Sequence, residues 1–212
     1  NMNIQKIVSG YASSNTYFIS IDHQMIVIDP CLEIQNNPNK LLEKIEGYEV
    51  LAILLTHAHF DHISGVDAIE NKTKCPVYLT EKERDWPQNP QLNLSTMTPE
   101  IVSIKAKITP LNLGDLEIGP FKFNVVETPG HTKGSVSFII DNHIFDGDFI
   151  FKDSVGRMDL PKGSEQDMKE AILSFIKSYG DKDYILYPGH GNKTTLQTEI
   201  KHNPFINHFK AA

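Results

Sequence analysis

The segment Thr56 to His62, which reads THAHFDH, constrains the fold more than any other part of the chain. It follows the apolar run 50–55 directly and carries four metal-ligating side chains: His57, His59, Asp61 and His62. Ligands on alternate residues cannot share one face of a helix, where neighbours are three or four residues apart. They suit a loop that leaves the carboxyl end of a buried strand, where α/β proteins commonly place catalytic groups. The segment therefore predicts a metal site at a strand end.

Three further apolar runs stop at a turn that carries a histidine or an aspartate. His131 follows the run 121–127, Asp148 follows 136–140 and a turn, and His190 follows 184–186. Five histidines are used by this pattern. The other four have no such context, and we interpret them as surface or locally hydrogen-bonded side chains: His23, His143, His202 and His208.

These motifs together resemble the metallo-β-lactamase superfamily and, within it, the short, single-domain glyoxalase II-like (hydroxyacylglutathione hydrolase-like) hydrolases. The shared pattern is HxHxDH, a GH turn, an aspartate after a glycine and a final GH, in that order. The likeness runs from Ile28-Asp29-Pro30 to the closing Asn203-Pro204-Phe205. It implies one α/β domain over residues 1–212, an αββα sandwich with two mixed β-sheets face to face and helices on both outer faces.

Hydrophobic periodicity, turn residues and helix caps give a reading that is consistent with that fold. Strands are expected near 3–8, 16–21, 24–28, 50–55, 76–79, 108–112, 115–118, 121–127, 134–140, 143–146 and 183–187. Helices are expected at 38–46, from 62 or 64 onward, at 164–178 and at 194–202. Ser164 suits an N-cap and Gly180 a helix stop.

The resemblance also implies a ligand set for two divalent metal ions. The first ion would be held by His57, His59 and His131, the second by Asp61, His62 and His190, and Asp148 would bridge both. Histidine and carboxylate ligands without thiolate favour zinc, iron or manganese, and zinc is our first expectation. Two ions about 3.5–4 Å apart supply a hydroxide near neutral pH and polarise a carbonyl, so no nucleophilic side chain is needed.

Two aspartates of these motifs have a second interpretation. Asp61 is the expected catalytic residue, because as a ligand it would orient the hydroxide and take a proton in the transition state. Asp29 either hydrogen-bonds a ligand histidine or is a turn aspartate. Cys31 stands where many relatives have glycine, which indicates a different loop at that point.

The sequence leaves three function classes open. The segment Gly156 to Asp159 and the motif around Asp148 are similar to the thioesterase and persulfide dioxygenase branches of the superfamily. Pro188-Gly189-His190-Gly191-Asn192 differs from the Pro-Ala-His-Asp-Tyr usual in the dioxygenases, which favours a binuclear hydrolase of small-thiol thioesters, such as S-lactoylglutathione. The alternatives are a mononuclear-iron persulfide dioxygenase and a metal-binding protein without catalysis.

The expected substrate contacts are Arg157, Asp159 and Trp86. Arg157 suits a substrate carboxylate through bidentate pairing, or else a salt bridge with Asp159. Trp86 belongs to the segment 85–99, which reads as a long loop; such loops are often binding lids. The Lys and Tyr residues that grip glutathione in full-length glyoxalase II enzymes are replaced here, and the chain stops at Ala212 without their C-terminal helical domain. The identity of the thiol carrier is therefore open.

Composition excludes several partners. The chain has 20 basic and 27 acidic residues, a net charge of −7, and no basic cluster of the kind that a nucleic acid requires. No apolar stretch approaches the roughly 20 residues that span a bilayer, and the N-terminus has no basic or apolar leader. Two cysteines are too few for a disulfide framework. We expect a cytoplasmic enzyme that acts on a small-molecule thioester and binds neither nucleic acid nor membrane.

Overall fold

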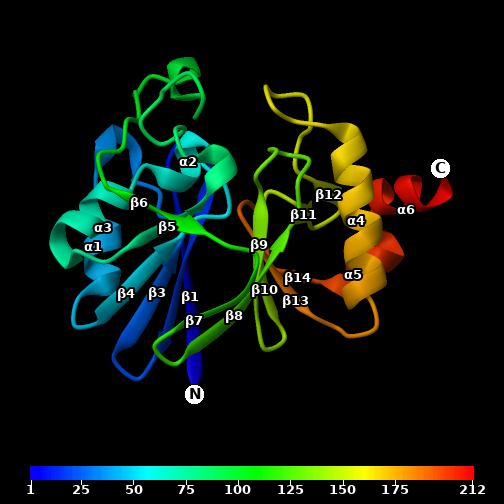
Figure 1. The fold of residues 1–212 in the computed structure, drawn as a ribbon, viewed down its shortest axis with the longest axis horizontal. Coiled ribbons are helices and arrows are strands. Elements are labelled where there is room, and N and C mark those ends of the chain that lie inside the picture. The colour runs from blue at the N-terminus through cyan, green and yellow to red at the C-terminus, as the bar shows by residue number, and fades with distance from the viewer. The chain divides into compact units, whose positions relative to one another are not determined.

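The computed structural model describes all 212 residues, which form two compact units. Unit 1 comprises Asn1–Leu111 and Ile118–Pro120, and unit 2 comprises Asn112–Glu117 and Phe121–Ala212. Each unit is built on one six-stranded mixed sheet with helices (Figure 1). The units are described in turn.

The sheet of unit 1 is antiparallel at one side and parallel at the other. Its order is β1 (Met2–Ser9), β2 (Ser14–Ile21), β3 (Gln24–Ile28), β4 (Glu49–Leu54), β5 (Val77–Thr80) and β6 (Ile108–Leu111). The strands from β3 to β6 are mutually parallel. Their carboxyl ends therefore share one edge, to which β3 brings Asp29 and β4 brings the segment Thr56 to His62.

Three helices cover one face of this sheet: α1 (Asn39–Ile45), α2 (Phe60–Ile63) and α3 (Val66–Thr73). Leu41 and Ile69 from the helices pack with Val27, Ile53 and Val77 from the strands in one apolar core. Three short 3₁₀ helices lie in the connections: η1 (Ile34–Asn36), η2 (Glu81–Glu83) and η3 (Ser95–Met97). Apart from η3, the segment 85–99 has no regular structure, as the sequence predicts for a long loop.

The sheet of unit 2 has the order β14 (Thr194–Thr195), β13 (Ile185–Pro188), β10 (His143–Gly147), β9 (Val136–Ile140), β8 (Phe121–Glu127) and β7 (Gly114–Ile118). Strands β8, β9 and β10 are antiparallel, and β10 is parallel to β13. A separate hairpin of β11 (Ile150–Phe151) and β12 (Ser154–Val155) follows β10. The parallel pair ends with Asp148 beyond β10 and His190 beyond β13, at the same edge of the sheet.

Three helices pack on one face of this second sheet: α4 (Glu165–Tyr179), α5 (Leu196–His202) and α6 (Pro204–Ala211). Met168 and Ile172 of α4 share an apolar core with Leu196 of α5, Ile206 of α6 and Leu186 of β13. None of the helices in the chain has the length and apolar character that a membrane span requires.

The predicted mixed α/β class, with two mixed sheets and helices, is confirmed. Ser164 caps α4 as expected: its Oγ accepts a hydrogen bond from the amide of Asp167 at 3.0 Å. The expected helix at 194–202 begins later, because Thr194 and Thr195 pair with β13 as β14 and Thr195 then caps α5. A helix over 204–211 was not expected as a separate element; it starts where Asn203 caps it and Pro204 takes the first helical position.

Candidate metal centre

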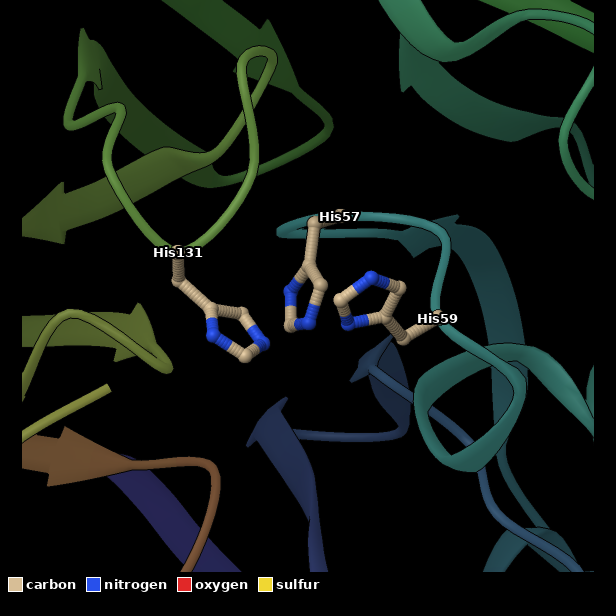
Figure 2. A group of neighbouring side chains, drawn as sticks. All are labelled: His57, His59 and His131. Carbon is tan, nitrogen blue, oxygen red and sulfur yellow. The ribbon is translucent and has the colours of Figure 1, made fainter. Parts of the chain in front are cut away.

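The loop after β4 brings four of the predicted ligands together. His57, His59, Asp61 and His62 are all at most 7% exposed. The His57 ring lies edge-on to that of His59, with centroids 5.0 Å apart, and 4.2 Å from that of His62. Figure 2 shows His57 and His59 on this loop. The loop turns into α2 at Phe60, so that Asp61 and His62 stand on the first turn of a helix.

Asp29 fixes the orientation of this loop. Its Oδ1 accepts a hydrogen bond from the Thr56 amide at 2.8 Å, and its Oδ2 accepts one from the Thr56 hydroxyl at 2.7 Å. The same Oδ2 lies 2.8 Å from Nδ1 of His62, while the Thr56 hydroxyl lies 2.9 Å from Nδ1 of His57. Because Nδ1 is engaged in both rings, Nε2 is the nitrogen that can bind an ion. Of the two interpretations of Asp29, the structure supports the hydrogen bond to a ligand histidine.

Two residues beyond β5 hold the middle of the loop. Glu83 is fully buried, and its Oε1 accepts a hydrogen bond from the Ala58 amide at 2.8 Å. Trp86 stacks on the His59 ring at a centroid distance of 5.9 Å and an angle of 19°. Trp86 is 3% exposed and packs in the core of unit 1. The structure therefore shows it in contact with His59, a predicted metal ligand. Its contact with substrate stays a prediction.

Asp61 has a neighbour of its own. The Ser14 hydroxyl donates a hydrogen bond to Asp61 Oδ2 at 2.8 Å, and the same oxygen lies 3.3 Å from Nε2 of His62. Cys31 lies in the same region, where burial raises the pKa of its thiol to about 11. Cys75 is buried as well, and neither cysteine forms a disulfide.

Unit 2 gathers the other three predicted ligands. Oδ2 of Asp148 lies 3.1 Å from Nε2 of His131 and 3.3 Å from Nε2 of His190. Asp148 and His131 are buried, while the His190 side chain is 27% exposed. One carboxylate oxygen therefore faces two histidines that follow different strands. The predicted bridging role of Asp148 is compatible with this position and stays a prediction.

The turn that carries His131 depends on the glycine before it. Gly130 has φ 143°, and a Cβ there would lie 2.6 Å from Cα of Met168 in α4. Figure 2 shows His131 on this turn. Nδ1 of His131 lies 2.8 Å from the carbonyl oxygen of Arg157. That contact again directs Nε2 toward an ion, and a backbone atom of the Gly-Arg-x-Asp segment supplies it.

Arg157 and Asp159 pair with each other at the surface. Nε and Nη2 of Arg157 donate hydrogen bonds to the two carboxylate oxygens of Asp159 at 2.7 and 3.0 Å. These hydrogen bonds raise the pKa of the Arg157 guanidinium and lower the pKa of the Asp159 carboxyl. The salt-bridge alternative is thus the arrangement seen, and the contact of either residue with substrate stays a prediction.

The hairpin after Asp148 is tied to the C-terminal helices by residues that the sequence analysis missed. Glu199 is fully buried; its Oε1 accepts hydrogen bonds from the Asp153 amide at 2.9 Å and from Asn203 Nδ2 at 3.0 Å. Its Oε2 accepts one from the Thr194 hydroxyl at 2.5 Å. Asn203 Nδ2 also donates to the carbonyl of Ser154 at 2.9 Å. The closing Asn-Pro-Phe motif was the available signal, because an asparagine before a proline predicts a helix cap.

Close packing holds the same hairpin against Asp148. A Cβ at Gly156 would lie 1.7 Å from the carbonyl oxygen of Asp148, so only glycine fits there. Phe151 packs edge-on to His190, with ring centroids 5.9 Å apart. Asp146 shapes the turn from within: its Oδ2 accepts a hydrogen bond from the Ile150 amide at 3.0 Å, and burial raises the pKa of its carboxyl well above the usual value.

The histidines outside the motifs take the places expected for them. The His23 side chain is 73% exposed. His143 lies 2.8 Å from the Tyr187 hydroxyl through Nδ1, and burial lowers the pKa of its imidazole. Neither His202 nor His208 belongs to a group of metal-ligating side chains.

The donor set of each unit fits a divalent ion such as zinc, iron or manganese. In unit 1 the ligand atoms of His57 and His59 lie within 4.8 Å of each other, as do those of Asp61 and His62. In unit 2 the ligand atoms of Asp148 and His190 also lie within 4.8 Å of each other. All are imidazole nitrogens or carboxylate oxygens, and no thiolate is among them, which suits these ions better than copper(I).

Comparisons with known proteins show the family of the chain. The family model of the metallo-beta-lactamase superfamily matches residues 10–190. A curated protein of Bacillus subtilis, "Probable metallo-hydrolase YqgX", is 35% identical over 98% of this chain and 99% of its own length. The chain therefore belongs to the metallo-β-lactamase superfamily, and it is similar to proteins named as metallo-hydrolases.

Two solved structures share both the fold and part of the sequence. The BLEG-1 B3 metallo-beta-lactamase is 38% identical with a TM-score of 0.85, over 96% of this chain and 99% of that one. TTHA1623, solved in a di-iron-bound form, is 32% identical with a TM-score of 0.81, over 95% of this chain and 99% of that one. The fold of the chain is that of the superfamily.

Proposed function

We propose that this metallo-hydrolase cleaves thioesters of small thiols at a centre of two divalent metal ions. The observation that carries the proposal is Asp148, whose Oδ2 lies 3.1 and 3.3 Å from Nε2 of His131 and His190. The family pattern assigns these two histidines to different ions. A carboxylate placed against both suits a bridging ligand, and the binuclear hydrolases of the superfamily resemble this chain in that respect.

The proposed ligands follow the family pattern. His57, His59 and His131 would hold one ion, Asp61, His62 and His190 the other, and Asp148 both. When bound, the ions supply an activated water and polarise the carbonyl of the substrate. Zinc is our first proposal, while iron is the alternative that the di-iron form of TTHA1623 supports.

The residues around the ligands have separate roles. Asp29 and the Arg157 carbonyl hold the rings of His62 and His131 with Nε2 directed to the ions. Asp61 would orient the activated water and take a proton during the reaction, which is the role that the family pattern gives it, and the hydrogen bond from the Ser14 hydroxyl holds its carboxylate in place. The Arg157 guanidinium is occupied by Asp159, which argues against a dedicated site for the glutathione carboxylates. The unoxidised thiols of Cys31 and Cys75 are compatible with the cytoplasmic location that we propose.

A comparison of two thioesters tests the substrate class. We expect the metal-loaded protein to hydrolyse S-lactoylglutathione and the lactoyl thioester of N-acetylcysteamine with similar kcat/KM, because the residues that would grip glutathione are replaced. A loss above about 100-fold on truncation would show a dedicated glutathione site. The absence of hydrolysis with either substrate would refute the thioesterase proposal itself.

A second candidate function is β-lactam hydrolysis. The 38% identity with BLEG-1, which is described as a B3 metallo-beta-lactamase, favours it. The same two-metal chemistry would open a lactam amide. A chromogenic cephalosporin in place of the thioester separates the two functions. If the protein hydrolyses the cephalosporin faster than any thioester, β-lactam hydrolysis becomes the first candidate function and thioester hydrolysis the second. Oxygen uptake on a persulfide would instead support the dioxygenase alternative.

A further inference from the structure

A small pocket in unit 1 shares one wall with the proposed metal loop. It is formed by the turn after β1, the connection from β3 through η1, the start of α2 and the end of the long loop after η3. Asp61 and Phe60 line it from α2, and Tyr11, Ile34 and Glu100 line it from the other segments. Its volume of about 30 Å³ leaves room for about two water-sized groups.

Exposed apolar side chains line this pocket or are next to its lining residues in the sequence. Eight large hydrophobic residues of the chain are substantially exposed, and two of them, Tyr11 at 56% and Ile34 at 50%, line the pocket itself. Met97 at 70% and Ile101 at 59% lie next to the lining residues Thr98 and Glu100 in the chain. Exposed apolar patches on a soluble protein commonly mark binding sites.

The charged groups of the lining are all acidic. They are Glu33, Asp61 and Glu100, and no lysine or arginine lines the pocket. Glu33 pairs with Lys40 at 3.1 Å, while Glu100 accepts hydrogen bonds from the Gln35 amide at 2.6 Å and from the Tyr11 hydroxyl at 3.5 Å. Because Glu33 is paired with Lys40 and Asp61 is a proposed metal ligand, Glu100 is the charge that a carboxylate of a substrate would meet in this pocket.

The walls of the pocket are held in place. Asn93 is fully buried, and its Nδ2 donates hydrogen bonds to the carbonyls of Trp86 at 3.0 Å and Val102 at 2.9 Å. The carbonyl of Asn93 accepts a hydrogen bond from the Phe60 amide at 2.8 Å. The long loop is thereby fixed to the residue before Asp61. Between the lining residues Ile34 and Asn36, Gln35 has φ 62°, a left-handed conformation that is uncommon outside glycine.

We infer that this pocket binds the acyl group of the substrate and selects short, uncharged, apolar acyl chains. The inference rests on the proposed thioesterase function and adds its acyl specificity. The volume of about 30 Å³ fits an acyl end of two or three carbons, and the half-exposed side chains of Tyr11 and Ile34 extend the apolar contact at the rim. Because Asp61 is both a lining residue and a proposed ligand, an acyl group held here lies beside the proposed metal loop.

Acyl thioesters of N-acetylcysteamine test the specificity. With the metal-loaded protein we expect kcat/KM to rise about 15-fold from acetyl to butyryl, since each of the two added methylenes favours binding by about fourfold when it is buried. Ile34→Asn should reduce this gain, because it removes an apolar contact at the rim of the pocket. The matched control is Leu113→Asn, because Leu113 is 55% exposed and lies outside the pocket. An equal loss of the acetyl-to-butyryl gain in both variants would overturn the inference. A kcat/KM that does not depend on the length of the acyl chain would overturn it as well.

A charged acyl group tests whether the pocket selects uncharged acyl chains. Succinyl thioester should be hydrolysed at least tenfold more slowly than butyryl thioester, and Glu100→Gln should narrow that gap because the amide keeps an acceptor for the Gln35 amide without the charge. A succinyl thioester that is as good a substrate as the butyryl one would contradict the inference.

Binding without turnover separates this inference from the function on which it rests. The thioether S-butyl-N-acetylcysteamine cannot be hydrolysed, and its binding to the protein is followed by the NMR shifts of the Ile34 and Ile101 methyl groups. Saturable shifts of both residues in the parent, with the Ile101 shift lost in Ile34→Asn, would support the pocket even if no thioester is cleaved. Hydrolysis without any shift of these methyl groups would support the thioesterase and reject the pocket.

Discussion

At the scale of single residues, the proposed ligands could be named from the sequence, whereas of the residues that support them only Asp29 could be named, and then as one of two interpretations. His57, His59, Asp61 and His62 lie within one short motif, so residue type and spacing are enough to predict them. Their partners lie far along the chain: Asp29 is 33 residues from His62, and Glu83 is 25 residues from Ala58. A sequence of one protein carries no signal for such pairs, because a buried carboxylate and a turn carboxylate look alike until the strands are placed.

Asp29→Asn tests the support that one such residue gives to the ligands. We expect metal affinity to fall about 10- to 100-fold, because an amide cannot accept hydrogen bonds at both positions that Thr56 and His62 occupy. Asparagine tolerates the φ of 53° found at Asp29, so the backbone should be retained. Isothermal titration with zinc measures the change.

Asp22→Asn is the matched control, since Asp22 has the same φ of 53° but is exposed and lies at a turn far from the ligands in the sequence. Unchanged zinc affinity in Asp29→Asn, or an equal loss of zinc affinity in both variants, would show that Asp29 does not support the proposed metal ligands.

At the scale of elements, prediction succeeded where the pattern is long and local. The helix at 164–178 has a capping serine, a clear apolar periodicity and a glycine beyond it, and it occurs as Glu165–Tyr179. The predicted helix at 194–202 was wrong at its start, because Thr194 pairs with β13 in the sheet. Local propensity carries no information on such a pairing between distant segments. Very short elements such as β11 and β12 depend on Glu199 and Asn203, more than 40 residues away.

Glu199→Gln tests whether α5 positions the hairpin beside Asp148. Three donors converge on the two carboxylate oxygens of Glu199, and a glutamine would turn its NH₂ group toward one of them. We expect the amides of 150–155 to exchange at least tenfold faster with solvent in the metal-free protein, and the affinity for zinc to fall about tenfold. Hydrogen exchange read by NMR and zinc titration measure the two effects.

Gln197→Ala is the control within the same helix. Its side chain donates hydrogen bonds to the carbonyls of Gly180 and Lys182 rather than to the hairpin. The variant should lower the thermal midpoint and leave both zinc affinity and the exchange of 150–155 unchanged. A zinc affinity that falls equally in the two variants would mean that general destabilisation, not positioning, is responsible.

At the scale of the whole molecule, the mixed α/β class and the superfamily could be predicted because four motifs occur in a fixed order along the chain. The single domain over 1–212 and the complete ligand set remain predictions, as does the identity of the metal. Unit 1 gathers His57, His59, Asp61 and His62, and unit 2 gathers His131, Asp148 and His190. Neither group contains all the ligands that the proposed centre needs.

The number of metal equivalents bound per chain tests the central claim most directly. Elemental analysis of the protein reconstituted with zinc should give two equivalents for the parent and about one for His190→Ala. Asp148→Ala should retain less than one, because a bridging carboxylate belongs to both coordination spheres. One equivalent in the parent, or equal metal content in Asp148→Ala and the parent, would contradict the two-metal centre.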